Sequence, residues 1–139
     1  MSFWDSSAVA PLLFPEEASK LRLRQVAAGD AMLVWWAVSV ECMSAIQRRA
    51  RSGLLSEAEA NAAIKNLRVM EKTWTEIAPT AELRQKAERL LLTHPLRAAD
   101  ALQLAAAIIG ADYEPDGLTF YTADTRLADA AAKEGFKVA

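Results

Sequence analysis

Short apolar runs and amphipathic segments alternate along the chain, which predicts strands and helices in turn. The chain opens with bulky, strand-forming residues and then turns polar, so we expect a first strand with Asp5 near its carboxyl end. Pro15 and the two glutamates after it favour a helix that continues to about Ala28. A continuous apolar run over 31–38 then predicts a central parallel strand covered on both faces.

The middle of the chain carries the clearest helix signals. Ser39 can cap a helix that contains Glu41 in its first turn and ends at Gly53. Ser56 and Glu59 form the two halves of a capping box, which predicts the start of a long helix. Apolar residues recur along that helix at the spacing of one buried face. We therefore expect two consecutive helices after the second strand.

The second half of the chain repeats the alternation of strands and helices. In one helix, Asp100 is the one charge on a face that also carries Leu104 and Ile108. Because no hairpin signal interrupts the alternation, the pattern predicts an α/β sandwich with a mainly parallel sheet and right-handed crossovers. The remaining predicted elements are a short strand at 76–78, helices over 80–93 and 96–110, a strand over 118–122, a helix over 126–134 and a final strand over 136–138.

Composition restricts the function more than it restricts the fold. A length of 139 residues suits one domain, and no apolar run reaches the roughly 20 residues of a membrane helix. We also find no signal-peptide pattern and expect a cytoplasmic protein. One cysteine (Cys42) and one histidine (His94) cannot build a thiolate or imidazole zinc site, so any metal must be held by oxygen. The net charge of −2 does not by itself indicate nucleic-acid binding.

Four acidic residues from distant parts of the chain are predicted to meet at one edge of the sheet. Asp5 and Asp124 each follow a strand, Glu41 lies one helical turn beyond another strand, and Asp100 lies near the start of its helix. Ligands of open parallel sheets bind at the carboxyl ends of the strands. Converging carboxylates repel one another, a cost that a bound cation removes, and hard oxygen ligands suit Mg²⁺ or Mn²⁺. The sequence therefore predicts a divalent metal site.

Four segments of the chain share one pattern, the order Asp, Glu, Asp, Asp with characteristic neighbours. The segments are WDSSA over 4–8, VEC over 40–42 with Arg48 and Arg49 following, LRAADALQLA over 96–105 and YTAD over 121–124. These segments resemble the PIN domain, and the nearest resemblance is to the VapC toxins of bacterial toxin-antitoxin pairs. Together they span nearly the whole chain, so residues 1–139 are interpreted as a single PIN domain.

The resemblance implies a three-layer α/β sandwich with a five-stranded, mainly parallel sheet. It also implies Mg²⁺- or Mn²⁺-dependent cleavage of RNA by a metal-activated water, a homodimer, and neutralisation by a cognate antitoxin. Whether one or two ions bind stays open. Residue by residue, Asp5, Glu41 and Asp100 match the three core acids of the family, and Asp124 matches its more variable fourth acid.

Other positions match or depart from the family pattern. Ser6 and Thr122 match small hydroxyl positions that help to order the site. Gln103 replaces a frequent histidine, and the pair Trp35 and Trp36 replaces smaller strand residues; we expect neither departure to touch the acids. The residues that could contact RNA phosphates are Arg48, Arg49, Arg97 and Arg126.

Each acid also has an ordinary structural interpretation. Asp5 could be a turn residue at a strand end, and Glu41 and Asp100 could be acids that interact with a helix dipole. Asp124 could cap the last helix rather than bind a metal. His94 is interpreted as a helix C-terminal residue rather than a general base. The two tryptophans are interpreted as core or dimer contacts.

Two other functions compete with the nuclease. One is a non-catalytic PIN-like module that binds RNA or a protein partner, although such a relic would be expected to have lost some of the acids. The other is a phosphoacceptor domain of the receiver or haloacid-dehalogenase kind. The dehalogenase pattern requires a second aspartate where Ser7 stands, and the acidic pair and late lysine of receivers are missing.

Overall fold

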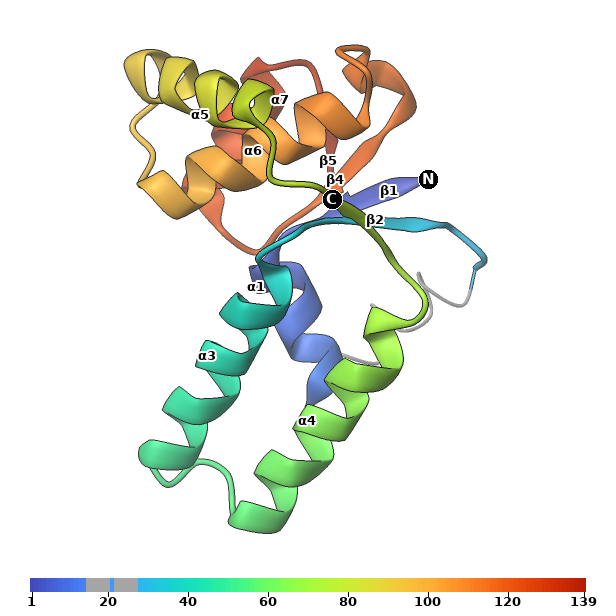
Figure 1. Ribbon diagram of the computed structural model, residues 1–139, viewed down its shortest axis with the longest axis vertical. Helices are drawn as coiled ribbons and strands as arrows, with labels where there is room; N and C mark the ends of the chain where they lie inside the picture. The colour runs from blue at the N-terminus through green and yellow to red at the C-terminus, as the bar shows by residue number, and fades with distance from the viewer. Residues whose placement is uncertain (15–20, 22–27) are drawn as a thin grey trace.

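A five-stranded, fully parallel sheet forms the middle layer of the molecule in a computed structural model that describes residues 1–14, 21 and 28–139. The strand order is β3-β2-β1-β4-β5 (Figure 1). Strand order reverses at β1, because β2 pairs with it on one side and β4 on the other. The strands are β1 (Ser2–Trp4), β2 (Met32–Trp35), β3 (Thr75–Ile77), β4 (Thr119–Tyr121) and β5 (Lys137–Val138).

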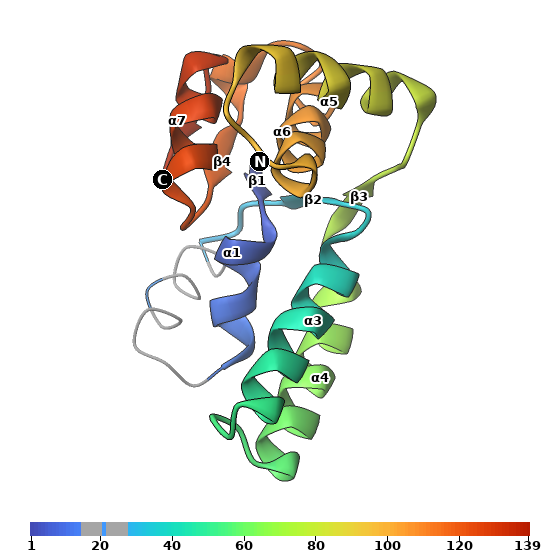
Figure 2. The same cartoon turned by 90° about the vertical axis from the view of Figure 1, so that its left-hand side faces the viewer.

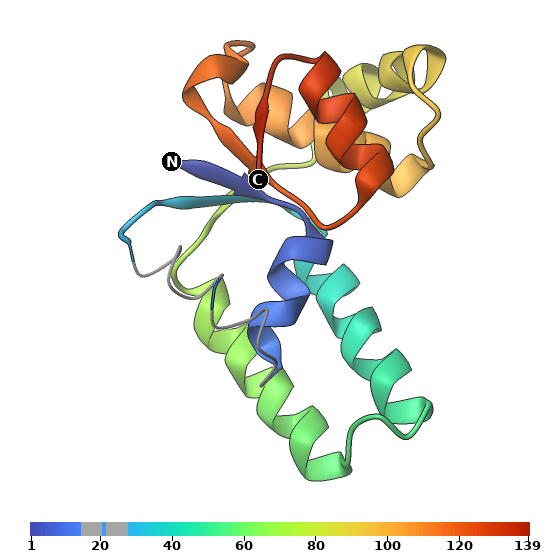
Figure 3. The same cartoon turned by 180° about the vertical axis from the view of Figure 1, so that it is seen from behind.

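Helices cover both faces of this sheet, which gives the predicted three layers. Helices α5, α6 and α7 lie on one face, and α1, α3 and α4 lie on the other (Figures 1 and 2). Helices α3 and α4 form a hairpin that extends away from the sheet (Figure 3). Their bounds are α1 (Ser6–Val9), α3 (Val38–Arg51), α4 (Glu57–Glu71), α5 (Ala81–Thr93), α6 (Ala98–Gly110) and α7 (Thr125–Lys133), with 3₁₀ turns η1 (Ala10–Leu13) and η2 (Pro115–Gly117).

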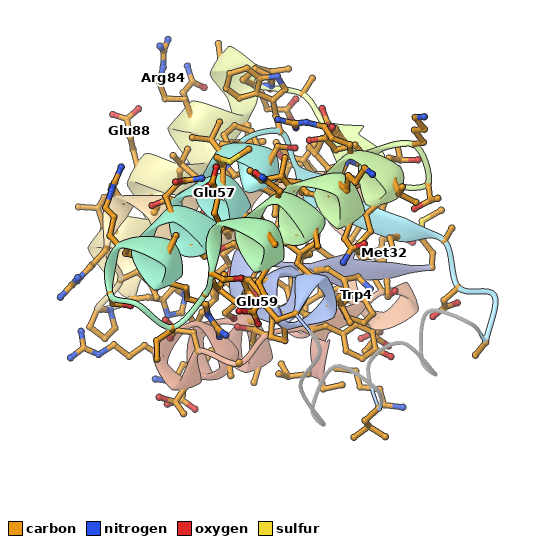
Figure 4. The ribbon with its side chains drawn as sticks, turned by 90° about the horizontal axis from the view of Figure 1, so that it is seen from below. Trp4, Met32, Glu57, Glu59, Arg84 and Glu88 are labelled. Atoms are coloured by element: carbon orange, nitrogen blue, oxygen red, sulfur yellow. The ribbon has the colours of Figure 1, made fainter. Side chains whose placement is uncertain are left out.

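The strands divide their side chains between two hydrophobic cores. In β1, Phe3 packs into the core beneath α5, α6 and α7, whereas Trp4 packs into the core beneath α1, α3 and α4. Figure 4 shows Trp4 and Met32 on this second face, where the Trp4 ring stacks on Tyr121 at 4.3 Å between centroids. Because successive side chains of a strand point to opposite faces, a strand buried on both faces is apolar throughout. The apolar strands are therefore explained by the layered fold.

Several local predictions are confirmed and several are wrong. The capping box of Ser56 and Glu59 begins α4 as expected. Ser39 does not cap α3, because the helix already begins at Val38 with Ala37 in the capping position. The second strand is shorter than predicted, since the chain turns after β2 and leaves the side chain of Trp36 53% exposed.

The start of the chain also differs from the sequence prediction. The chain enters α1 and η1 directly after the first strand, at residues for which no helix was predicted. The helix expected over 15–28 lies almost entirely outside the described residues. None of the helices in the described part of the chain is long and apolar enough to cross a membrane.

The core beneath α6 gives a direct test of this packing. Leu104 is fully buried, so Leu104→Ala should lower the free energy of unfolding by about 2–5 kcal/mol through lost burial and a residual cavity. The same substitution at Leu92, whose side chain is 89% exposed, should change it by less than about 0.5 kcal/mol. Urea unfolding followed by circular dichroism measures both values. Equal effects at the two positions would contradict the assigned core.

Candidate active site

Asp5 lies at the carboxyl end of β1 and is held by three donors. Its Oδ1 accepts from the backbone N–H of Ala8 at 2.9 Å and from the hydroxyl of Ser7 at 2.7 Å. Its Oδ2 accepts from the hydroxyl of Thr122 at 2.7 Å. Asp5 therefore caps α1 as a turn aspartate does, and it also ties the end of β1 to the segment after β4.

The environment of Asp5 opposes its ionisation. Only 2% of the residue is exposed, and this burial raises the pKa of its carboxyl group above the ordinary value. Hydrogen bonds from Thr122, Ser7 and Ala8 act in the opposite direction but do not cancel the effect of burial. The negative charge of Asp124 raises the pKa of Asp5 further. A buried acid beside another acid is an expensive arrangement for a purely structural residue.

Glu41 is held from two sides in the first turn of α3. Its Oε2 accepts from the hydroxyl of Ser6 at 3.0 Å, and its Oε1 accepts from the side-chain amide of Gln103 at 2.9 Å. The expectation that Gln103 does not touch the acids is therefore wrong. Burial is the main cause of a raised pKa at Glu41, and the charges of Asp5 and Asp100 raise it further. The two hydrogen bonds lower it, but by less.

Asp124 and Asp100 lie at the starts of two helices on the same edge. Asp124 caps α7, since its Oδ1 accepts from the backbone N–H of Leu127 at 3.0 Å. The capping interpretation is thus correct, but it engages one oxygen and remains compatible with ligand binding by the other. Asp100 lies in the first turn of α6, where burial first and the charge of Asp124 second raise its pKa. The charges of Arg97 and Arg126 oppose this rise.

The structure brings the four predicted acids into one electrostatic neighbourhood. Charge interactions join Asp5 to Asp124, Asp124 to Asp100, Asp100 to Glu41, and Glu41 to Asp5. No three histidine, cysteine or acidic side chains among the described residues form a ready-made metal centre. The chemistry of the four carboxyl groups nevertheless fits a hard cation, because such cations prefer oxygen ligands. Three of the four have raised pKa values, and a bound cation would favour their ionised form.

An open groove with a volume of about 690 Å³ lies beside these acids. It contains Asp100 and Asp124 together with three of the four arginines that were predicted to contact RNA. The fourth, Arg49, does not line this groove, and its guanidinium lies 4.1 Å from the ring centre of Phe14. The groove is lined by Arg48, Arg97, Ala99, Asp100, Ala123, Asp124, Thr125 and Arg126.

Similarity to known proteins covers almost the whole chain. No protein-family model matches it. Ribonuclease VapC45 and ribonuclease VapC49, from two strains of Mycobacterium tuberculosis, are each 33% identical to it over 140 residues. Both alignments cover 99% of this chain and 93% of the relative. The chain belongs to the VapC ribonuclease family.

Two solved structures share the fold of this VapC chain. VapC20 of Mycobacterium tuberculosis, described as a sarcin-ricin loop cleaving toxin, matches with a TM-score of 0.69 at 19% identity. The match covers 98% of this chain and 96% of VapC20. FitAcB of Neisseria gonorrhoeae matches with a TM-score of 0.66 at 15% identity, covering 99% and 96% of the two chains. The predicted PIN-like fold is confirmed.

Two polar contacts of this VapC site were not predicted. Ser7 was considered only as a departure from the dehalogenase pattern, yet its hydroxyl binds Asp5 and accepts from the backbone N–H of Ala123 at 2.8 Å. A serine two residues after a strand-end aspartate is a recognisable local signal for such a contact. The sequence signal for the Gln103 contact was weaker. It consisted of an amide side chain one helical turn beyond Asp100, in a helix whose other residues after Asp100 are apolar or glycine.

The raised pKa values predict how the stability of this VapC protein depends on pH in EDTA. Glu41 binds a proton more strongly in the folded state than in the unfolded state. This stronger proton binding stabilises the folded state below the ordinary pKa of 4.5, and the stabilisation is lost as pH rises through the folded-state pKa. The isosteric Glu41→Gln variant should therefore unfold at a higher urea concentration than the wild type at pH 7. The difference should shrink as pH falls through the folded-state pKa of Glu41 and should be absent below 4.5.

Glu88→Gln is the matched control, since Glu88 is exposed on α5 and points away from the body (Figure 4). Glu88→Gln should have the same urea midpoint as the wild type at pH 7 and also below pH 4.5. A wild type that is more stable than Glu41→Gln at pH 7 in EDTA would contradict the electrostatic account of the site.

Proposed function

We propose that this VapC protein is an endoribonuclease that hydrolyses phosphodiester bonds with Mg²⁺ or Mn²⁺ and is the toxin of a toxin-antitoxin pair. The observation that carries the proposal is the convergence of four carboxylates from distant segments at the carboxyl edge of the sheet. The names of VapC45 and VapC49, both ribonucleases, support RNA as the substrate. The description of VapC20 as a toxin that cleaves the sarcin-ricin loop agrees with this role.

The four carboxylates share one task in this proposal but differ in how firmly the fold holds them. Asp5, Glu41, Asp100 and Asp124 would hold the cation, which supplies a Lewis acid that activates water and neutralises charge on the phosphodiester. Asp5 is the most rigid of the four because hydrogen bonds from two hydroxyls and a backbone N–H fix its carboxylate. The half-buried Glu41 and Asp100 would move inward on binding, since the described side chains do not already form a metal centre.

Arginines of the neighbouring groove would position the RNA backbone. Arg97 and Arg126 act electrostatically on Asp100, and together with Arg48 they line the groove beside it. A guanidinium group can bind a phosphate through two parallel hydrogen bonds. Such contacts fix the register of a nucleic acid without selecting its sequence. This local cluster explains how a chain with a net charge of −2 can bind RNA.

A cognate antitoxin and a second copy of the chain are the proposed protein partners. The family gives the expectation of both, and the VapC20 description names a toxin. A partner that covers the groove would block the acids and the arginines together. In this proposal, the antitoxin therefore inhibits by occupying the substrate site.

The second candidate is a non-catalytic module that binds RNA or a protein through the same edge. One observation favours it: no ready-made metal centre exists among the described side chains. Against it, the capping of α1 explains Asp5 but does not explain Glu41 and Asp100, two further acids with raised pKa values in the same neighbourhood. The two candidates differ in whether the protein cleaves RNA, because the first predicts cleavage that requires a cation and the four acids and the second predicts none.

Cleavage of a panel of structured RNAs tests the first candidate. Purified protein without antitoxin should cut RNA with Mg²⁺ or Mn²⁺ and should be inactive in EDTA. Asp5→Asn and Asp100→Asn should each lower the cleavage rate by about 100-fold or more, because each removes a carboxylate that is proposed to bind the cation. Gel analysis of the products under single-turnover conditions gives the rates.

Asp116→Asn is the control for these variants, since Asp116 is exposed in η2, away from the groove. It should cleave at the wild-type rate. If none of the four proteins cuts while all are folded, the non-catalytic module becomes the better account. If all four cut equally in Mg²⁺, the acids are not the catalytic site.

The arginine groove makes its own prediction. In EDTA, where the RNA is not cut, Arg97→Ala and Arg126→Ala should each weaken RNA binding. Each should also reduce the slope of log affinity against log salt concentration by about 0.7–1, because one phosphate contact is lost. Fluorescence anisotropy with a labelled RNA measures the slope. Arg84→Ala, which alters an arginine that projects from α5 (Figure 4), should leave both affinity and slope unchanged.

A further inference from the structure

Gln103 is a polar side chain in the interior of the molecule. Its exposed fraction is 1%, and its neighbours along α6 are apolar. It lies three residues after Asp100, so both side chains project from the same face of the helix. The helix therefore brings a carboxylate and a buried amide to the same edge of the sheet.

Among the described residues, the amide of Gln103 makes one hydrogen bond, and that bond crosses between the two helical layers. Its Nε2 donates to Glu41 Oε1 at 2.9 Å. Gln103 belongs to α6, which packs on one face of the sheet, whereas Glu41 belongs to α3, which packs on the other (Figure 1). The bond thus joins the layers at the carboxyl edge, where the acids converge.

The other end of the same amide has no partner in the described part of the chain. Gln103 Oε1 is buried and accepts no hydrogen bond from any described residue. A buried carbonyl without a donor costs free energy, and an apolar side chain of the same size would avoid that cost. Packing alone therefore does not explain a glutamine at this position. Within the described residues, the favourable polar contact of this amide is the one with Glu41.

We propose that Gln103 is a positioning residue that fixes the carboxylate of Glu41 for cation binding. The inference rests on the proposed function. Ser6 holds one oxygen of Glu41 from α1 and Gln103 holds the other from α6, so the carboxylate is oriented from both sides. Gln103 is the more deeply buried of the two donors, because Ser6 is only half-buried. Outer hydrogen bonds of this kind orient metal ligands and set the affinity of the site.

Gln103→Met tests the inference, because methionine keeps the length of the side chain but removes the donor and the unpartnered acceptor. The variant should bind Mn²⁺ about tenfold more weakly than the wild type in calorimetric titrations. Its kcat for RNA cleavage should fall while KM for RNA stays unchanged, since the arginine groove is intact. In EDTA it should unfold at the same or a higher urea concentration than the wild type.

Two further variants separate positioning from a structural role. Gln85→Met, the same substitution at an exposed position on α5, should change none of these quantities. In the Glu41→Gln background, Gln103→Met should cause no additional loss of Mn²⁺ affinity, because the group on which it acts has been replaced. An equal additional loss in both backgrounds would overturn the inference and indicate general damage to the fold.

The outcomes distinguish this inference from the function on which it rests. A wild type that neither binds Mn²⁺ nor cleaves RNA overturns both. A wild type that does both, with a Gln103→Met variant of equal Mn²⁺ affinity and kcat, overturns the positioning role alone. Weaker Mn²⁺ binding with retained stability supports it.

Discussion

The burial of the Asp5 carboxyl group is the constraint on which the rest of the site depends. The carboxylate is 2% exposed and lies beside other acids, so its ionised form must be stabilised by donors that the fold supplies. One donor comes from Thr122 after β4, and the others come from Ser7 and Ala8 at the start of α1. The parallel pairing of β1 with β4 brings Thr122 to this carboxylate, and the turn from β1 into α1 brings Ser7 and Ala8. The strand order that reverses at β1 therefore creates the site.

The site also joins the two helical layers. Glu41 is approached by Ser6 from one layer and by Gln103 from the other, so its position depends on how both layers pack on the sheet. Three acids with raised pKa values make this edge costly for the fold in the absence of a cation. Functional sites commonly reduce stability in this way, and a ligand that binds only the folded state repays the loss.

Local patterns in the sequence predicted the class of fold and the positions of the acids. Asp5 and Asp124 follow apolar runs, and such runs indicate strands whatever their neighbours are. The contact of Gln103 with Glu41 was not predictable from local pattern, because it joins residues 62 apart through the packing of α6 and α3. The exposure of Trp36 was missed for a similar reason, since the end of β2 is set by its partner strand.

Diffraction from crystals grown with Mn²⁺ tests the central claim most directly. Anomalous scattering locates the ion without assumptions about its ligands. The account predicts a Mn²⁺ peak within bonding distance of Asp5 and of at least two of Glu41, Asp100 and Asp124, about 2.0–2.2 Å from their oxygens. Crystals at saturating Mn²⁺ with no peak at the carboxyl edge of the sheet would contradict the claim that these carboxylates form a metal site.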